Sequence, residues 1–170
     1  AQRAEQMRET MATMTDVVRH VASNLRPAAL DMGLVAAIEW LAEDFSLRWE
    51  TTCTVLLSSD EPDDWARLPE PVALALFRAV QESLTNIAKH AQAHNVGIRL
   101  QQAGAGVQLS VSDDGRGFDL AAVTVRKGGG LGLLGMRERM HAIGADLDIQ
   151  TGSGGTTLTI HYPSIRSIRV

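Results

Sequence analysis

The most constraining feature of the sequence is a cluster of glycines in its second half. Of the 15 glycines among 170 residues, seven lie between positions 115 and 135: Gly115, Gly117, Gly128, Gly129, Gly130, Gly132 and Gly135. Glycine adopts backbone conformations that other residues avoid, and it lets a second group approach the backbone closely. A surface loop would explain a pair of glycines, but here a helical pattern begins directly after the cluster. The cluster therefore indicates backbone built for close approach at the start of a helix.

The apolar residues around this cluster predict helices and strands in a mixed order. Helical periodicity covers residues 4–25, 32–48, 71–91 and 131–143, with Asp31 as the candidate N-cap of the second helix. Alternating apolar residues predict strands near 53–57, 96–100, 107–111, 147–149 and 158–162, and the last four pair as two hairpins. Because hairpins dominate the second half, we expect an α+β fold, a two-layer α/β sandwich, rather than a doubly wound parallel sheet.

Composition excludes several classes of function. The net charge is −4 without any basic block, and aromatic residues make up only 4%, which argues against a nucleic-acid-binding surface. The single Cys53 excludes an internal disulfide and gives little support to a thiolate metal site. No apolar run approaches 18 residues and no signal peptide is present, so we expect a cytoplasmic location for this part of the protein.

The first predicted helix has a narrow apolar face and needs a partner. Its apolar residues follow alternating three- and four-residue steps: Ala4, Met7, Met11, Met14, Val18, Val21 and Leu25. Three heptads are too short to be stable alone, so we expect a partner helix from an upstream segment or another chain. We therefore divide the chain into a helical stub (1–27), one domain (28–163) and a tail (164–170).

Asp113 is the first candidate functional residue. It is in phase with the apolar residues of the strand 107–111, so its carboxylate would point toward the core and would need a partner in a pocket. A carboxylate accepts hydrogen bonds only, which suits an amino group or a ring N–H of a ligand. The alternative is an ordinary turn aspartate that caps its own backbone.

Two further groups could bind a phosphorylated ligand. On the helix 71–91, Asn86 could ligate Mg²⁺, Glu82 could polarise a water, and Lys89 could meet phosphate, although a solvated helix face explains the same pattern. The glycines that run into the last helix offer bare N–H groups and a helix N-terminus to an anion. They include a formal G-x-G-x-x-G match, which is weak because no strong strand precedes it.

Taken together and in order, these segments resemble a known family. The segments at 81–91, 113–118, 130–139 and 154–156 resemble the N, G1, G2 and terminal boxes of GHKL ATPases of the histidine-kinase type. The sequence is most similar to the sensor-kinase subfamily that includes nitrate sensors, and residues 24–34 resemble the exit from its dimerisation and phosphotransfer hairpin. The resemblance covers about 5–163 and implies the Bergerat fold, with a mixed, mostly antiparallel sheet and helices on one face.

The resemblance also implies a role for each matching residue. Asp113 would accept from the adenine amino group, Gly115 and Gly117 would belong to the adenine-binding turn, with Gly117 leaving room for the ring, and Thr156 would lie near an adenine-bound water. Asn86 would hold Mg²⁺ beside Glu82 as the polarising carboxylate. The remaining predicted contacts are with the phosphates and involve Lys89, His90, Gly130, Gly132 and Leu133.

The reaction implied by the resemblance is transfer of the ATP γ-phosphoryl group to a histidine and then to an aspartate of a response regulator. His20 lacks the sequence setting of the family's acceptor, so the acceptor is expected upstream, in a full-length homodimer with a possible membrane anchor in its upstream region. Two alternatives stay open: a GHKL-fold serine kinase, and a nucleotide-sensing interaction module without catalysis.

Overall fold

The computed structural model describes residues 28–59, 65, 68–120 and 131–163. The predicted helix 4–25, the tail 164–170 and the glycines at 128–130 lie outside the described residues. The division of the chain at residues 27 and 163 therefore stays a prediction.

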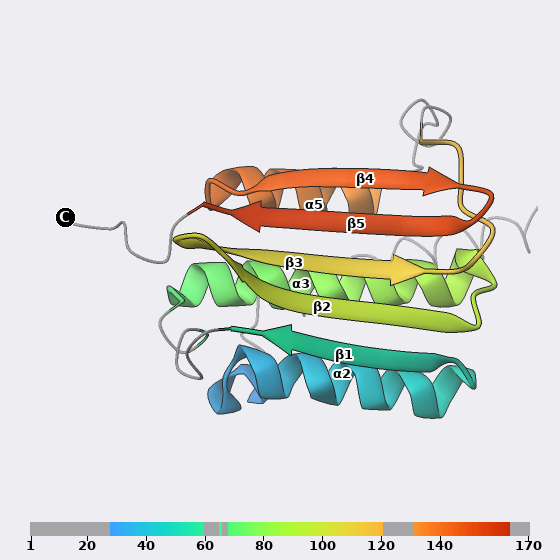
Figure 1. Ribbon diagram of the computed structural model, residues 1–170, viewed down its shortest axis with the longest axis horizontal. Coiled ribbons are helices and arrows are strands. Elements are labelled where there is room, and N and C mark those ends of the chain that lie inside the picture. Colours follow the sequence, from blue (N-terminus) through green and yellow to red (C-terminus); the bar gives the residue numbers. More distant parts are fainter. Residues whose placement is uncertain (1–27, 60–64, 66–67, 121–130, 164–170) are drawn as a thin grey trace, which may run out of the picture.

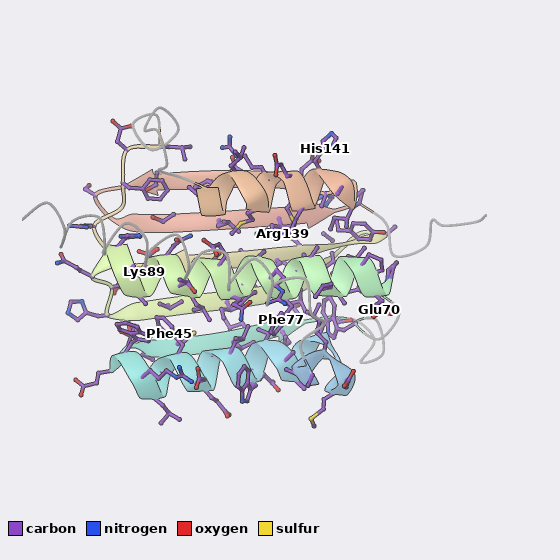
Figure 2. All side chains as sticks on the ribbon, turned by 180° about the vertical axis from the view of Figure 1, so that it is seen from behind. Phe45, Glu70, Phe77, Lys89, Arg139 and His141 are labelled. Carbon is purple, nitrogen blue, oxygen red and sulfur yellow. The ribbon has the colours of Figure 1, made fainter. Side chains whose placement is uncertain are left out.

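The described residues form one five-stranded sheet with helices on one of its faces. The strands are ordered β1-β2-β3-β5-β4, and only β1 and β2 are parallel. The helices all lie on the same side of the sheet, behind it in Figure 1 and in front of it in Figure 2. The strands are β1 (Thr52–Ser58), β2 (Asn95–Ala103), β3 (Gly106–Asp113), β4 (Asp146–Gly152) and β5 (Gly155–Tyr162). The main helices are α2 (Leu34–Trp49), α3 (Glu70–Asn86) and α5 (Leu131–Ala142). The predicted two-layer α+β sandwich is confirmed.

Helix α3 lies in the middle of the helical layer and carries much of the core. The face predicted to be apolar is buried along its whole length, and its residues are Leu76, Val80, Leu84, Ile87 and Ala91. The inward side chains of β2 and β3 meet this layer, with Ile98, Leu100 and Leu109 fully buried. Beyond Asn86 the helix continues as a π-helical turn, η3 (Ile87–Ala91), which carries the last two residues of this face.

One local expectation needs correction. Asp31 is not the N-cap of α2, since it lies inside a 3₁₀ turn, η1 (Ala28–Met32), and the N-cap position is Gly33. Gly33 has φ 95°, a conformation that L-residues rarely adopt, so the chain can leave η1 and begin α2 at Leu34. In the edge strand β1, Cys53 is half-buried, whereas Leu57, near the end of the strand, is 42% exposed.

Candidate functional site

Asp113 lies half-buried at the end of β3, directly opposite Thr156 of β5. Its Oδ1 accepts a hydrogen bond from the N–H of Gly115 at 2.9 Å, and the N–H of Thr156 donates to the same carboxylate. Burial raises the pKa of Asp113 above its usual range, and these two bonds oppose that rise. The prediction that Asp113 points inward is therefore supported. The bond to Gly115 is also the local capping that an ordinary turn aspartate makes, so this contact alone does not separate the two interpretations.

The neighbouring Asp114 anchors the same turn to the start of β2. Its Oδ1 accepts from the backbone N–H groups of His94 and Asn95 at 2.8 and 2.9 Å, and its Oδ2 accepts from Nδ2 of Asn95 at 2.7 Å. These hydrogen bonds lower the pKa of the exposed Asp114 to about 2. Nothing in the spacing of the sequence indicates this contact, because its partners lie some twenty positions away.

Arg116 fastens the turn to the end of the central helix. Its N–H donates to the carbonyl of Ala91 at 2.9 Å, and its Nε donates to the carbonyl of His90 at 2.8 Å. Gly115 packs so closely against Ala91 that a Cβ there would overlap the carbonyl oxygen. A cation at a helix C-terminus is favourable, because the last carbonyls carry partial negative charge. The turn that contains Asp113 is thus held on the helix that carries Asn86, Lys89 and His90.

The β4–β5 hairpin closes the other side of this turn. Gly117 has φ 61°, and a Cβ at that position would overlap the carbonyl oxygen of Gly152. The N–H of Phe118 donates to Oγ1 of Thr151 at 2.9 Å, and that hydroxyl is 3.2 Å from the hydroxyl of Thr156. Close backbone packing is therefore one reason for glycine at position 117, whereas its role beside an adenine ring stays a prediction.

The residues predicted to face metal and phosphate lie along the outer side of the same helix. Glu82 and Asn86 are half-buried, whereas Lys89 and His90 are exposed. Figure 2 places Lys89 at the opposite end of this helix from Glu70.

The start of α5 meets this row of side chains at Glu82. Gly132 lies directly against Glu82, and a Cβ on Gly132 would overlap Oε1 of that carboxylate. Leu133 is half-buried in the same turn of α5, and Gly130 lies outside the described residues. The structure therefore brings the first turn of α5 to the predicted polarising carboxylate.

The described residues contain no group of three or more His, Cys, Asp or Glu side chains that could hold a metal ion. Asn86 can supply one oxygen ligand, and Mg²⁺ commonly takes its other ligands from water and substrate phosphates. This donor set suits a metal that arrives with a nucleotide. Among the helices of the described part, none has the length and hydropathy needed to cross a membrane.

Comparisons with known proteins agree with this arrangement. Residues 72–166 match the family described as histidine kinase-, DNA gyrase B- and HSP90-like ATPases. The chain is 33% identical over 159 residues to the signal transduction histidine-protein kinase/phosphatase DegS of Brevibacillus brevis, covering 92% of this chain and 39% of the relative. It is 33% identical over 147 residues to the sensor histidine kinase MctS of Rhizobium johnstonii, covering 86% of this chain and 31% of the relative.

Solved structures support the fold. The histidine kinase AdeS of Acinetobacter baumannii superposes with a TM-score of 0.64 at 13% identity, covering 96% of this chain and 84% of the other. The blue-light activated histidine kinase EL346 of Erythrobacter litoralis gives 0.61 at 24% identity, covering 82% and 45%.

The matched segment includes every described residue of the candidate site, from Glu82 to Thr156. The chain spans well under half the length of these curated relatives. Both relatives are named as histidine kinases, which favours a histidine kinase over a serine kinase or a non-catalytic module. The nitrate-sensor subfamily is not singled out and stays a prediction. With the family match spanning more than half of its length, the chain belongs to the histidine kinase-, DNA gyrase B- and HSP90-like ATPases, the GHKL family, and is an ATP-binding domain of the sensor histidine kinase type.

Proposed function

We propose that this chain is the catalytic part of a sensor histidine kinase that binds Mg·ATP and directs its γ-phosphoryl group to a histidine upstream of the sequence. The observation that carries the proposal is the junction between the turn 113–117 and the C-terminal end of the central helix. Arg116 and Gly115 hold an acceptor carboxylate, Asp113, beside the helix end that bears Lys89 and His90. The turn and the helix end would together present Asp113 to the adenine and present Lys89 and His90 to the phosphates.

The adenine end of the site would rest on Asp113. Its carboxylate is partly desolvated, and a hydrogen bond from the adenine amino group would offset the cost of that burial. Thr156 lies opposite Asp113 in the strand register, where its hydroxyl could order a water against the base. Gly115 and Gly117 contribute by letting the turn pack against its neighbours without side chains.

The phosphate end would rest on the outer side of the central helix and the first turn of α5. Asn86 would hold Mg²⁺ through its amide oxygen, and Mg²⁺ when bound supplies neutralisation of phosphate charge. Lys89 and His90 are exposed, so they can reach phosphate oxygens. Gly130, Gly132 and Leu133 would present backbone N–H groups to the same phosphates.

Glu82 would polarise the attacking group, and its contact with Gly132 ties that carboxylate to the phosphate cradle. Catalysis in such a site is mostly positioning and charge neutralisation. The phosphoryl group would pass from the upstream histidine to an aspartate of a response regulator, within a homodimer of the full-length protein.

Calorimetric titration with Mg·ATP tests the adenine assignment. Replacing Asp113 with Asn removes a charged acceptor, and hydrogen bonds to charged groups contribute about 1.5–3 kcal/mol, so we expect affinity to fall roughly 10- to 100-fold. Asp146→Asn is the matched control, because this exposed carboxylate lies at the opposite end of β4 from the hairpin turn that contacts Gly117. Equal affinity of the wild type and Asp113→Asn would contradict the proposal.

A further inference from the structure

Three polar side chains form a row across the end of the sheet that carries Asp113. In the strand register, Asp113 of β3 is opposite Thr156 of β5, and Thr156 is opposite Thr151 of β4. Directly opposed residues of an antiparallel pair project from the same face of the sheet. The row continues the inward, apolar columns of these three strands, whose residues are Val107, Leu109, Val111, Leu147, Ile149, Leu158 and Ile160. Thr151 therefore lies on the same face of the sheet as Asp113, next to Thr156.

The hydroxyl of Thr151 contacts two hydrogen-bonding groups. Its Oγ1 accepts from the N–H of Phe118 at 2.9 Å, and it lies 3.2 Å from the hydroxyl oxygen of Thr156. The side chains of Thr151 and Thr156 are both half-buried. A hydroxyl has one proton to donate and two lone pairs that accept. The N–H of Phe118 occupies one lone pair of Thr151, so the proton of Thr151 still needs an acceptor.

The direction of the bond between the two hydroxyls follows from this count. Within the part of the chain that the structure describes, Thr156 is the only acceptor that the proton of Thr151 reaches. A half-buried hydroxyl has lost part of its contact with water, so the arrangement in which Thr151 donates to Thr156 is favoured. Thr156 then accepts from Thr151, and its own proton is left for a ligand beside Asp113.

This arrangement of donor and acceptor matches one edge of adenine. Adenine carries its amino group, which donates, next to ring N1, which accepts. Asp113 can only accept, and Thr156 is set to donate, so the two residues present the complementary pair. A base with a carbonyl oxygen and a protonated N1 has the reverse pattern. A site with fixed donors and acceptors rejects the reverse pattern, because its own polar groups are then left unpaired.

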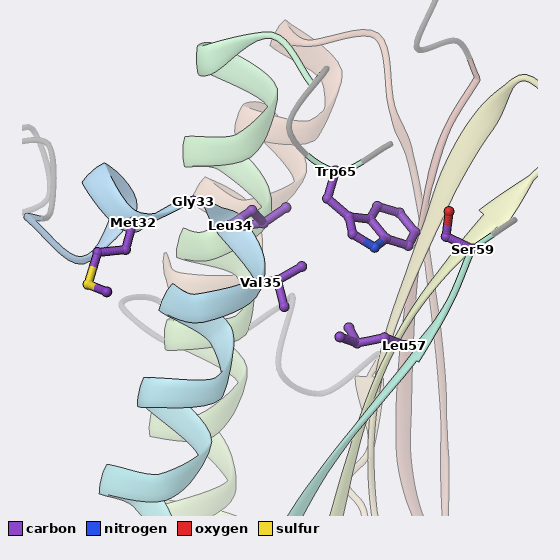
Figure 3. Close-up of a pocket in the computed structure, with 7 residues that line it drawn as sticks. All are labelled: Met32, Gly33, Leu34, Val35, Leu57, Ser59 and Trp65. Carbon is purple, nitrogen blue, oxygen red and sulfur yellow. The ribbon is translucent and has the colours of Figure 1, made fainter. Parts of the chain in front are cut away.

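The apolar groove at the opposite end of the sheet has a different chemistry. Figure 3 shows this groove between α2 and the end of β1, with the side chains of Val35, Leu57 and Trp65 around it. The described residues that line the groove include no carboxylate. Because β1 and β2 are parallel, the groove lies near the C-terminal end of β2, whereas Asp113 pairs with Val96 near the start of β2. The groups that match a base edge therefore lie in the polar row.

We propose that Thr151 is a positioning residue that holds the hydroxyl of Thr156 as a donor toward ring N1 of adenine, directly or through one water. Thr151 acts through Thr156 and does not itself touch the nucleotide. This inference rests on the proposed nucleotide site and adds a determinant of base selectivity to it.

Calorimetric titration with two nucleotides tests this role. In 1-deaza-ATP the amino group of ATP is kept and ring N1 is replaced by C–H, so the ratio of its Kd to that of ATP reports the contact at N1. For one neutral hydrogen bond we expect a ratio of roughly 3 to 10 in the wild type. Thr151→Val no longer holds the hydroxyl of Thr156, so we expect its ratio to fall below about 2. Thr151→Ser keeps the hydroxyl and should keep the wild-type ratio.

A purely structural role of Thr151 predicts a different result. Thr151→Val also removes the acceptor of the Phe118 N–H, and a displaced turn would weaken both nucleotides by the same factor and leave the ratio unchanged. Thr157→Val is the matched control, because it makes the same exchange beside Thr156 but on the other face of the sheet, and it should keep the wild-type ratio. An unchanged ratio in Thr151→Val, or a ratio in Thr151→Ser as low as in Thr151→Val, would overturn the inference.

A second background separates this inference from the proposed function. Thr156→Val removes the donor itself and should give the same low ratio as Thr151→Val. Combining the two substitutions should lower the ratio no further, and a further fall would show that Thr151 does not act through Thr156. A wild type that binds neither nucleotide would contradict the proposed function as well, whereas a wild type that binds ATP with a ratio near 1 would reject the role of Thr151 alone. Melting curves establish that each variant is folded.

Discussion

Replacing Gly117 with alanine tests whether the turn after Asp113 is held by its backbone contacts. The matched control is Gly104→Ala, because the two glycines have nearly identical φ angles of 61° and 62°. A Cβ at Gly104 would meet no atom within 4 Å, whereas a Cβ at Gly117 would overlap the carbonyl oxygen of Gly152. The pair of variants therefore separates the cost of the left-handed conformation from the cost of the overlap.

The magnitudes follow from these two contributions. A left-handed conformation costs a non-glycine residue about 1–2 kcal/mol, which both variants share. Forcing an extra carbon into a packed site adds about 1–3 kcal/mol at Gly117 alone. For a chain of this size 1 kcal/mol lowers Tm by about 2–4 °C, so we expect a fall of about 2–8 °C for Gly104→Ala and about 4–20 °C for Gly117→Ala.

Thermal unfolding followed by circular dichroism measures the loss of stability of each variant. Calorimetry with Mg·ATP, at a temperature where both variants are folded, measures the affinity for nucleotide. Gly117→Ala should weaken nucleotide binding because it displaces the turn that holds Asp113. Gly104→Ala lies in the β2–β3 connection and should leave binding unchanged. If the two variants lose the same stability, the contact with Gly152 does not hold the turn, and the reasoning fails.

Two further predictions concern Asp114 and phosphoryl transfer. Hydrogen bonds lower the pKa of Asp114 from 3.8 to about 2, so its stabilising contribution is present above pH 3.8 and is lost as the pH falls through about 2. In denaturant unfolding at stepped pH, the stability difference between wild type and Asp114→Ala should shrink from pH 4 to pH 2, and a constant difference would count against these bonds. We also expect no acid-labile phosphate on this chain after incubation with radiolabelled ATP, because the acceptor histidine is expected upstream; labelling of the chain itself would place the acceptor within it.

Much of the fold follows from short-range pattern. The apolar stripe of the central helix, from Leu76 to Ala91, was predictable because helical periodicity shows directly which side chains share a face. The hairpin β2–β3 was predictable from alternation on both sides of a glycine-containing turn. Asp31 was misassigned, because the difference between a capping aspartate and a 3₁₀ turn ended by a glycine at φ 95° depends on backbone angles.

The sequence by itself determined the kind of residues in the candidate site, since the inward phase of Asp113 and the spacing of Glu82 and Asn86 are local properties of one strand and one helix. Only the tertiary structure decided how these elements meet. Arg116 bonds to a carbonyl 26 residues earlier, and Asp114 to the start of β2. Such contacts depend on sheet order and on the π-helical end of the central helix, and residues so far apart in the chain leave no periodic trace in the sequence.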